Sequence, residues 1–326
     1  MNRSILVTGP ALSPSAMAFA AEQNVKVIPT RPYAPVEELL AIIATEQPGA
    51  VIVRQGQFGR ELIEAMPDLR IIAKHGVGYD TIDIQAAAER NIPVTIALGA
   101  NAQSVAEHAF ALMFSVARQV AWLDGRMRGG NWDKATAKGV ELSGKTLGLI
   151  GLGSIGGILL DLVAPLNMQV RIFDPYLKTL PERPNISRES DFERLLEDCD
   201  VISLHCPLTA DNRHLIGAAQ LERMKPGSIL INTARGELID SQALIAALRA
   251  GQIGGAGLDT FEQEPPAADS ALWSLANLVA TPHVGANTQE SQDRVGLLAV
   301  QQIVAHWAGE TLQPRSVVNR HLLPAR

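Results

Sequence analysis

The feature that most constrains the fold is a glycine-rich turn in the middle of the chain, Gly151-Leu152-Gly153-Ser154-Ile155-Gly156. It follows the apolar run Leu147–Ile150 directly and opens the helical pattern Ile158–Val163. Only glycine allows so tight a turn together with a close approach of backbone N–H groups to a pyrophosphate, which rests on the positive end of the following helix. A strand, this turn and a helix in this order predict a parallel α/β sheet that binds a dinucleotide.

An acidic residue follows the next predicted strand, Val170–Phe173, at the spacing that such a site needs. A carboxylate at Asp174 accepts hydrogen bonds from the hydroxyls of the adenosine ribose. An acid there also repels a 2′-phosphate, so the sequence favours NAD over NADP. The alternative is that the glycines make only a structural turn and that Asp174 caps the loop before Pro175.

Short β-branched runs alternate with amphipathic segments along the whole chain, which is typical of parallel sheets covered by helices on both faces. In the first half we expect helices such as Val36–Glu46 and Ile84–Arg90, and strands near Ile5–Thr8, Val25–Ile28, Ala50–Arg54, Arg70–Lys74 and Pro93–Ala97. In the second half we expect strands at Thr146–Ile150, Val170–Phe173, Val201–His205, Ser228–Asn232, Gly257–Asp259 and Leu278–Ala280. The chain therefore predicts two doubly wound sheets.

A long helical pattern separates the two sheets. We expect it to begin after Asn101, with Ser104 and Glu107 forming a capping box, and to end at Gly129–Gly130. A last helix is expected over Thr288–Gly309. The apolar residues of the long helix cover more of its surface than a single stripe, which favours burial on several sides and contact with a second subunit. These residues are Val105, Ala109, Leu112, Met113, Val116 and Val120.

Composition excludes several classes of protein. The 326 residues, 47% of them hydrophobic, suffice for two domain cores. A net charge of −6 without a basic stripe argues against nucleic acid as a partner. No apolar run is long enough for a membrane span, and the N-terminus reads as a strand rather than a signal peptide. Two unpaired cysteines, Cys199 and Cys206, predict a cytoplasmic protein without disulfides, and no cluster has the spacing of a metal site.

Polar residues follow three of the late strands, at the sheet edge where α/β proteins bind ligands. The segments are Asn232–Gly236 with Arg235, Asp259–Pro265 with Glu264, and Thr281–Ala286 with His283. An arginine holds a carboxylate in bidentate fashion and polarises a keto oxygen. A histidine oriented by a carboxylate donates the proton that accompanies a hydride. These residue types suit the reduction of a 2-keto acid, although each of them alone is equally typical of a surface or loop residue.

The sequence resembles the D-isomer-specific 2-hydroxyacid dehydrogenases over nearly its whole length. The most specific motif is Met224-Lys225-Pro226-Gly227-Ser228-Ile229-Leu230-Ile231-Asn232-Thr233-Ala234-Arg235-Gly236, and Arg235 takes the place of the substrate-binding arginine. Glu264 in Asp-x-Phe-x-x-Glu-Pro takes the place of the acid that orients the histidine, and His283 in Thr-Pro-His-x-Gly-Ala that of the general acid/base. We expect reduction to slow as the pH rises and His283 loses its proton.

The resemblance implies further roles. His75-Gly76-Val77-Gly78 is similar to a substrate loop, so Gly76, Val77 and Gly78 are expected to bind the substrate carboxylate through backbone N–H groups. It also implies a flavodoxin-like substrate domain, residues 1–101 with 288–326, and a Rossmann NAD-binding domain, residues 102–287. The cofactor is expected to contact the glycine-rich turn, Asp174 and a further set of residues: Val105, Cys206, Pro207, Ala234, Arg235, Asp259, His283 and Gly285.

The identity of the substrate is left open by the sequence. Arg54 resembles an arginine that phosphoglycerate dehydrogenases use near the distal group of the substrate, but Gln55-Gly56-Gln57-Phe58 replaces their small hydroxylated residues, so a surface role is also open. The expected partners are a small 2-keto or 2-hydroxy acid, of the hydroxypyruvate, glyoxylate or 3-phosphoglycerate type, and a second copy of the chain in a homodimer. Trp132 is similar to an aromatic residue that in some relatives reaches the neighbouring subunit.

Two other functions fit the same family pattern. One is an NAD-sensing transcriptional corepressor, which keeps the same three residues as an interaction protein. The other is a formate or phosphite dehydrogenase, which differs in the residues around the substrate loop. A hydrolase on an α/β sheet is disfavoured because the chain has neither a Gly-x-Ser-x-Gly elbow nor a Gly-Lys-Ser/Thr loop.

Overall fold

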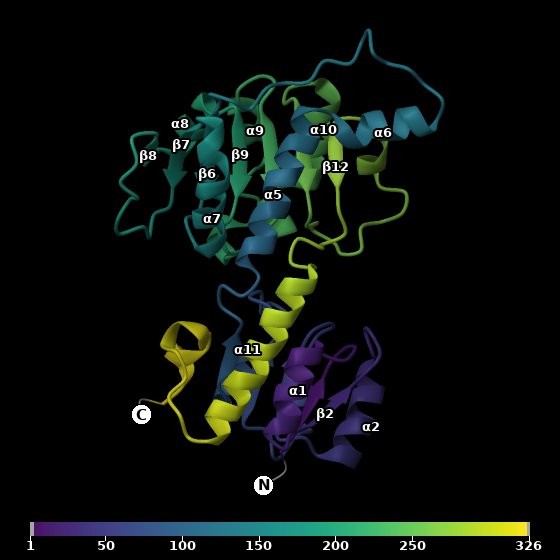
Figure 1. The fold of residues 1–326 in the computed structure, drawn as a ribbon, viewed down its shortest axis with the longest axis vertical. Helices are drawn as coiled ribbons and strands as arrows, with labels where there is room; N and C mark the ends of the chain where they lie inside the picture. Colours follow the sequence, from purple (N-terminus) through teal and green to yellow (C-terminus); the bar gives the residue numbers. More distant parts are fainter. Residues whose placement is uncertain (1–2, 325–326) are drawn as a thin grey trace. The chain divides into compact units, whose positions relative to one another are not determined.

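The computed structural model describes residues 3–324, which divide into two compact units. Unit 1 comprises residues up to Asn101 together with those from Asn287 onward, and unit 2 comprises Ala102–Ala286. The predicted domain boundary near residue 287 differs from this division by one residue. Figure 1 shows a sheet flanked by helices in each unit.

The sheet of unit 1 is parallel, with the strand order β2-β1-β3-β4-β5, which is the flavodoxin-like order expected from the sequence. Its strands are β1 (Ser4–Val7), β2 (Lys26–Pro29), β3 (Ala50–Val53), β4 (Ile71–Lys74) and β5 (Val94–Ile96). Its helices are α1 (Pro14–Glu22), α2 (Val36–Glu46), α3 (Arg60–Glu64), α4 (Ile84–Glu89) and α11 (Gln289–Trp307).

Both faces of this sheet are covered by helices. Successive side chains of a strand point to opposite faces, so each strand contributes side chains to both cores. Ile5 and Val7 of β1 lie in the core cluster that α1 and α11 cover, whereas Leu6 lies in the cluster that includes residues of α2, α3 and α4. The strands therefore read as continuous apolar runs rather than alternating ones. The C-terminal segment also belongs to this unit: the buried Asn319 accepts a hydrogen bond from the backbone of Val94, on edge strand β5.

The sheet of unit 2 is also parallel, with the strand order β12-β11-β10-β9-β6-β7-β8. Its strands are β6 (Thr146–Ile150), β7 (Gln169–Phe173), β8 (Ile186–Arg188), β9 (Val201–Leu204), β10 (Ile229–Asn232), β11 (Gly255–Leu258) and β12 (Leu278–Ala280). Its helices are α5 (Ala102–Ala117), α6 (Val120–Arg128), α7 (Ser154–Val163), α8 (Phe192–Asp198), α9 (Ala218–Arg223) and α10 (Ser241–Ala250). The strand order reverses between β6 and β9, which is where doubly wound sheets bind their ligands.

Helix α5 packs against this sheet because β11 carries glycine at the contact. A Cβ added at Gly255 would lie 2.7 Å from Cγ1 of Val116, and one added at Gly257 would lie 3.0 Å from Cβ of Leu112. Five of the six apolar residues expected to be buried on the long helix lie on α5 and are buried within unit 2: Val105, Ala109, Leu112, Met113 and Val116. The sixth, Val120, is 55% exposed.

Two expectations about the long helix are wrong. The helix begins at Ala102, so Ser104 and Glu107 lie inside it and do not form a capping box. It is also interrupted, because Gln119 has a φ of 55° and separates α5 from α6. The sequence carries no glycine or proline there, so nothing in its pattern marks the break. The short edge strand β8 was likewise not expected.

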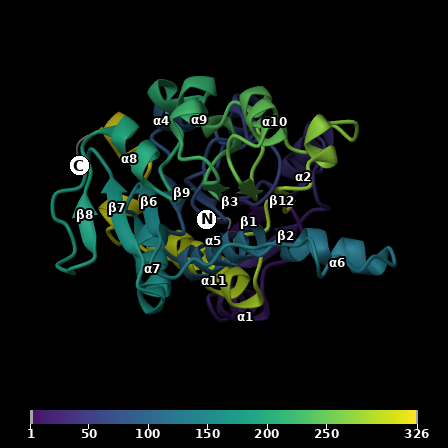
Figure 2. The ribbon, with the colours of Figure 1, turned by 90° about the horizontal axis from the view of Figure 1, so that it is seen from above.

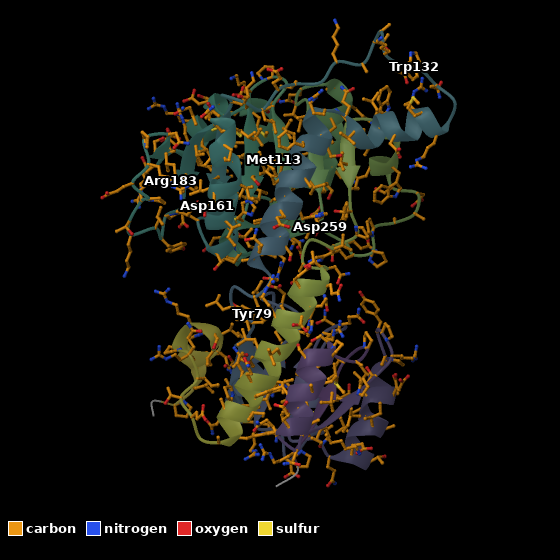
Figure 3. All side chains as sticks on the ribbon, in the orientation of Figure 1. Tyr79, Met113, Trp132, Asp161, Arg183 and Asp259 are labelled. Carbon is orange, nitrogen blue, oxygen red and sulfur yellow. The ribbon has the colours of Figure 1, made fainter. Side chains whose placement is uncertain are left out.

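Helix α6 has no buried residue. It projects away from the sheet of unit 2 in the two views of Figures 1 and 2, and the loop that follows it carries Trp132 at its outer part in Figure 3. The side chains of Val120, Met127, Trp132 and Val140 are exposed by 55%, 52%, 75% and 46%. No helix within residues 3–324 combines the length and the apolar character that crossing a membrane requires.

Candidate active site

The glycine-rich turn connects β6 to α7 at the point where the strand order of unit 2 reverses. Gly151 has a φ of 92°, and a Cβ added there would lie 2.8 Å from the backbone N of Cys206, after β9. A Cβ on Gly156 would lie 2.7 Å from the carbonyl oxygen of Gly151. Both positions therefore need glycine to let the backbone close up.

Gly153 differs from these two glycines because a Cβ added there would meet nothing within 4 Å. It is the N-cap of α7 and has no side chain to satisfy the first N–H groups of that helix. The N-terminus of α7 therefore presents donors and positive dipole to an open space, which fits a pyrophosphate. Ser154 is exposed and Ile155 half-buried at this helix start.

Asp174 lies at the end of β7 beside the same turn. One of its carboxylate oxygens accepts from the backbone N of Leu152 at 2.9 Å, and the other accepts from the backbone N of Tyr176 at 2.9 Å. The carboxylate is thus fixed next to the turn, and each oxygen retains a further lone pair for a donor such as a ribose hydroxyl. The turn, the helix start and this acid together fit a dinucleotide cofactor.

Glu264 and His283 lie against each other at the carboxyl ends of β11 and β12. His283 Nδ1 is 2.7 Å from Glu264 Oε2, and Glu264 Oε1 accepts from the backbone N of Phe261 at 3.0 Å. The side chains of His283 and Glu264 are 50% and 38% exposed. The Glu264 carboxylate therefore orients the imidazole and leaves its Nε2 for another partner.

The loop that carries His283 is held by the buried carboxylate of Asp259, at the end of β11. Its Oδ1 accepts from the backbone N of Val284 at 2.9 Å and from the hydroxyl of Thr281 at 2.6 Å, and its Oδ2 accepts from the backbone N of Gly285 at 2.8 Å. His283 itself has a φ of 52°, a left-handed conformation that needs such support. Figure 3 labels Asp259 at this edge of unit 2.

Arg235 lies at the end of the neighbouring strand, β10. The buried Asn232 shapes its loop, since the Asn232 amide donates to the carbonyl of Arg235 at 2.8 Å and accepts from the backbone N of Ala234 at 3.0 Å. A Cβ added at Gly236 would lie only 1.9 Å from the carbonyl carbon of Phe261. Glycine is therefore required for the Arg235 segment to contact the segment that carries Glu264.

The charges of these residues act on one another. Burial by itself would raise the pKa of Glu264, but the hydrogen bond to His283, the backbone N–H of Phe261 and the positive charge of Arg235 together hold that pKa below its ordinary value. Glu264 is thus kept ionised. The three residues that the sequence singles out for catalysis therefore lie together in unit 2.

The other predicted cofactor residues of unit 2 lie at the same sheet edge or against it. Cys206 and Pro207 follow β9 beside Gly151, and Ala234 precedes Arg235. Val105 is buried on α5, with 5% exposure. Gly285 is needed for close packing, because an added Cβ would lie 2.9 Å from Asp259 Oδ2.

The predicted substrate residues of unit 1 lie at the carboxyl ends of its strands. Gly76, which follows β4, has a φ of 140°, and Gly76, Val77 and Gly78 are half-buried. Arg54 follows β3, and its guanidinium donates to the carbonyls of Pro10 and Ala11 at 2.8 and 2.9 Å and to Gln292 Oε1 at 2.9 Å. Burial lowers the pKa of Arg54, and these three acceptors carry no charge.

The isolated histidines His75, His108 and His205 are packed or hydrogen-bonded. His108 Nε2 lies 2.8 Å from the Thr281 hydroxyl, and His205 Nε2 lies 2.8 Å from the Ser203 hydroxyl. Burial lowers the pKa of His75 to about 3, with a contribution from the charges of Arg54 and Lys74, and that of His205 to about 4. Among residues 3–324, no three His, Cys, Asp or Glu side chains are grouped so as to hold a metal ion.

Sequence reasoning missed two supporting residues, Asn232 and Thr281. Asn232 begins the segment that carries Arg235, and Thr281 begins the one that carries His283. Their signal in the sequence is a polar residue where an apolar strand ends. His108 contacts Thr281 from α5, and its position within 3.4 Å of Asp259 Oδ1 could be found only from the packing of α5 on the sheet.

Comparison with known proteins agrees with this geometry. A sequence model described as "D-isomer specific 2-hydroxyacid dehydrogenase, NAD binding domain" matches residues 110–285, more than half of the chain. The chain belongs to the D-isomer-specific 2-hydroxyacid dehydrogenase family. Unit 2 contains the NAD-binding domain of this family, which confirms the prediction of a Rossmann domain with NAD as its cofactor.

Relatives in the family carry several names. The chain is 42% identical over 272 residues to a D-3-phosphoglycerate dehydrogenase from Archaeoglobus fulgidus, covering 83% of this chain and 51% of the relative, so it spans about half the length of that protein. It is 39% identical to a glyoxylate reductase from Thermococcus litoralis, covering 90% of this chain and 89% of that one. The crystal structure of a glyoxylate reductase from Paecilomyes thermophila aligns with a TM-score of 0.85 at 32% identity, over 96% of this chain and 99% of that chain.

The buried carboxylate of Asp259 predicts a specific dependence of stability on pH. Burial alone would raise its pKa, but hydrogen bonds from His108, Thr281 and two backbone N–H groups lower it overall. A carboxylate whose pKa is lowered by folding stabilises the folded chain at pH values above about 4, the ordinary pKa of an aspartate. This contribution is lost as the pH falls through the pKa of the folded state. Asp259→Asn is therefore expected to lower the unfolding temperature at neutral pH more than at pH values of about 3.

Thermal unfolding followed by circular dichroism between about pH 7 and pH 3 measures this difference. The matched control is Asp269→Asn, which removes an exposed carboxylate of the same unit and is expected to leave the curve unchanged. Equal loss of stability by Asp259→Asn at every pH would contradict the prediction.

Proposed function

We propose that this chain reduces a small 2-keto acid to the corresponding D-2-hydroxy acid with NADH, and catalyses the reverse oxidation with NAD. The observation that carries the proposal is the contact of 2.7 Å between His283 Nδ1 and Glu264 Oε2, with Arg235 beside them on the next strand end. Family membership supports the same reaction class. The relatives that the chain matches are named for more than one substrate, so the reaction is proposed here at the level of this class.

His283 is the proposed proton donor. Its Nδ1 is engaged by Glu264, so the proton on Nε2 faces the reacting oxygen. Glu264 is kept ionised by His283, Phe261 and Arg235, and a neighbouring negative charge favours the protonated imidazole. Reduction then transfers the Nε2 proton to the keto oxygen, and the same nitrogen accepts it back during oxidation.

Arg235 is the proposed anchor of the substrate. A guanidinium binds a carboxylate through two parallel hydrogen bonds, which fixes the orientation of the neighbouring keto group. By resemblance to the family, the backbone N–H groups of Gly76, Val77 and Gly78 bind the same carboxylate. Glycine at two of these positions leaves the backbone accessible to the substrate.

The proposed cofactor contacts follow from the fit of the glycine-rich turn. Gly151, Gly153, Ser154, Ile155 and Gly156 would hold the pyrophosphate on α7, and Asp174 would accept from the adenosine ribose. Bound NADH supplies the hydride for the keto carbon. The contacts around the nicotinamide are proposed for the remaining residues: Val105, Cys206, Pro207, Ala234, Arg235, Asp259, His283 and Gly285.

The reaction is tested by following NADH oxidation with a panel of 2-keto acids: glyoxylate, hydroxypyruvate, phosphohydroxypyruvate, pyruvate, oxaloacetate and sulfopyruvate. His283→Asn is expected to lower kcat by about 10²- to 10⁴-fold, the usual contribution of a general acid. Asparagine is chosen because it tolerates the left-handed backbone of His283 better than other residues. Arg235→Lys keeps the charge but not the bidentate contact, so it is expected to raise KM for the keto acid.

The matched control is His321→Asn, which changes an exposed histidine of unit 1 and is expected to leave kcat unchanged. Reduction by the unaltered protein is also expected to slow as the pH rises, because the proposed general acid must carry a proton. Binding of NADH without turnover of any keto acid would contradict the proposal and favour a corepressor-like binding protein.

We further propose that Arg54 gives the enzyme a preference for substrates with a distal anion, such as a phosphate, sulfonate or second carboxylate. The three hydrogen bonds of its guanidinium go to neutral oxygens and fix its position without neutralising its charge. Arginine has five N–H donors, so these bonds leave further donors to bind an anion.

Arg54→Gln is therefore expected to lower kcat/KM for phosphohydroxypyruvate or sulfopyruvate by about 10- to 100-fold, since hydrogen bonds to charged groups contribute about 1.5–3 kcal/mol. The value for glyoxylate, which has no distal group, is expected to change little. Arg31→Gln is the control, because it removes an exposed arginine of the same unit that pairs with Glu38. Equal losses for charged and uncharged substrates would show that Arg54 has only a structural role.

The homodimer is proposed on the exposed apolar residues of α6 and the loop that follows it. Val120, Met127, Trp132 and Val140 are unusually exposed for large apolar residues, and exposed apolar surface is typical of protein interfaces. Tryptophan is also enriched among the residues that dominate such interfaces.

Light scattering after size-exclusion chromatography tests this proposal. The unaltered chain is expected to have twice the mass of one chain, and a variant that combines Met127→Glu with Trp132→Glu is expected to be monomeric, because charges do not fit an apolar interface. Tyr176→Glu, at a residue of unit 2 that is 91% exposed, is the control and is expected to remain dimeric. A monomeric unaltered chain would contradict the proposal.

The proposed compartment is the cytoplasm. The chain has two cysteines, and both Cys199 and Cys206 are free thiols. Proteins of oxidising compartments more often use their cysteines in disulfides, so sparse free thiols favour a reducing environment.

A further inference from the structure

A second histidine–carboxylate pair lies on the turn that carries Glu264. His214 Nε2 is 2.5 Å from Glu262 Oε1, and the backbone N of Ser241, the first residue of α10, donates to Glu262 Oε2 at 3.0 Å. The side chains of His214 and Glu262 are 42% and 25% exposed. Both oxygens of the Glu262 carboxylate are therefore held, and Glu262 is only two residues from Glu264.

The backbone around His214 contacts a different active-site segment. The His214 N–H donates to the carbonyl of Glu237 at 2.8 Å, and the N–H of Ile216 donates to the carbonyl of Leu238 at 2.9 Å. Residues 237 and 238 directly follow the loop of Arg235. His214 has a φ of 54°, so its side chain leaves this pairing from a left-handed backbone. One residue thus joins the Arg235 segment through its backbone and the Glu264 segment through its imidazole.

These two segments also touch each other. The Cα of Gly236 packs so closely against the backbone of Phe261 and Glu262 that a Cβ there would lie 1.9 to 2.4 Å from their atoms. Because the two backbones are packed closely enough to exclude any side chain at Gly236, a displacement of the Glu262 turn changes the position of Glu264 relative to Arg235 and His283.

We propose that His214 and Glu262 are positioning residues of the active site, which tie the turn after β11 to α10 and to the segment after Arg235 and so keep Glu264 against His283. The catalytic meaning of this role rests on the function proposed above. Its geometric consequence is independent of turnover, because a Glu264 carboxylate that moves away stabilises the protonated form of His283 less.

The charged groups around His283 allow positioning to be separated from direct electrostatics. Within unit 2, Glu264 bonds to His283 directly, and the charge of Arg235 acts on Glu264. Asp259 holds the loop of His283, with His108 beside it, and the pair of His214 and Glu262 lies on the turn that carries Glu264. Removal of His214 takes away a residue that can only be neutral or positive, so its direct effect would favour protonation of His283. Loss of the proposed positioning has the opposite sign, because it weakens the contact with Glu264.

The experiment is a pH titration of the protein labelled with ¹⁵N-histidine, followed by NMR. The chain has 7 histidines, and the signal of His283 is assigned from its absence in His283→Asn. In His214→Ala the titration midpoint of His283 is expected to fall by about 0.5 pH unit or more, where one unit corresponds to a tenfold change in the protonation equilibrium. His214→Gln, whose amide can replace Nε2 as a donor, is expected to restore the midpoint.

A second variant removes the other support of Glu262 without changing any charge. Ser241→Pro deletes both the backbone N–H and the side-chain hydroxyl that bond to Glu262, and proline is well tolerated at the first position of a helix. The midpoint of His283 is expected to fall in this variant as well. The control is Arg183→Gln, which removes an exposed ion pair with Asp161, also 2.5 Å long and labelled in Figure 3, and is expected to leave the midpoint unchanged.

A midpoint in His214→Ala and Ser241→Pro that equals or exceeds that of the unaltered protein would overturn the inference, as would an equal fall in Arg183→Gln. Kinetics give a separate readout: kcat for reduction is expected to fall about 3- to 10-fold, within the range of one weakened hydrogen bond, with KM for NADH unchanged. If the midpoint falls but the unaltered protein reduces no 2-keto acid, the proposed function fails and the positioning role holds. If the unaltered protein reduces a 2-keto acid but the midpoint of His283 is unchanged in the variants, the proposed function holds and the positioning role fails.

Discussion

The buried carboxylate of Asp259 is the interaction on which the candidate active site depends. It accepts backbone hydrogen bonds from Val284 and Gly285 and a side-chain bond from Thr281, and it thereby holds His283 in a left-handed conformation that an L-residue rarely adopts. A buried charge is stable only when its hydrogen bonds are satisfied, so the carboxylate and the loop hold each other in place. The position of the imidazole relative to Glu264 follows from this arrangement.

Close backbone contacts also fix the segments that follow the neighbouring strands. Gly236 lets the Arg235 segment touch the Glu264 segment, and Gly151 lets the turn after β6 touch the segment after β9. In both places a side chain would occupy the space of another backbone. Glycine therefore brings the charged groups to one edge of the sheet, where Arg235 contributes to keeping Glu264 ionised. The same kind of contact underlies the positioning role proposed for His214 and Glu262.

Much of the fold was predictable because strands buried on both faces read as short apolar runs. Helix Val36–Glu46 and strands Thr146–Ile150 and Leu278–Ala280 have the predicted bounds, and the other expected strands differ by one or two residues at their ends. The start of α5 was misplaced because Ser104 and Glu107 match a capping pattern although both lie inside the helix. The break at Gln119 was not predictable because no glycine or proline marks it. Asn232 and Thr281 were overlooked as supports because their roles appear only as contacts.

The sequence by itself determined two doubly wound parallel sheets, the glycine-rich turn with its following acid, and the three residues Arg235, Glu264 and His283, because periodicity and turn chemistry are local properties of the chain. Only the tertiary structure decided how these residues meet. The hydrogen bond between His283 and Glu264, the support from Asp259 and His108, and the link from His214 through Glu262 to Ser241 all join segments separated along the chain. Such contacts depend on strand order and side-chain packing, which no local pattern encodes.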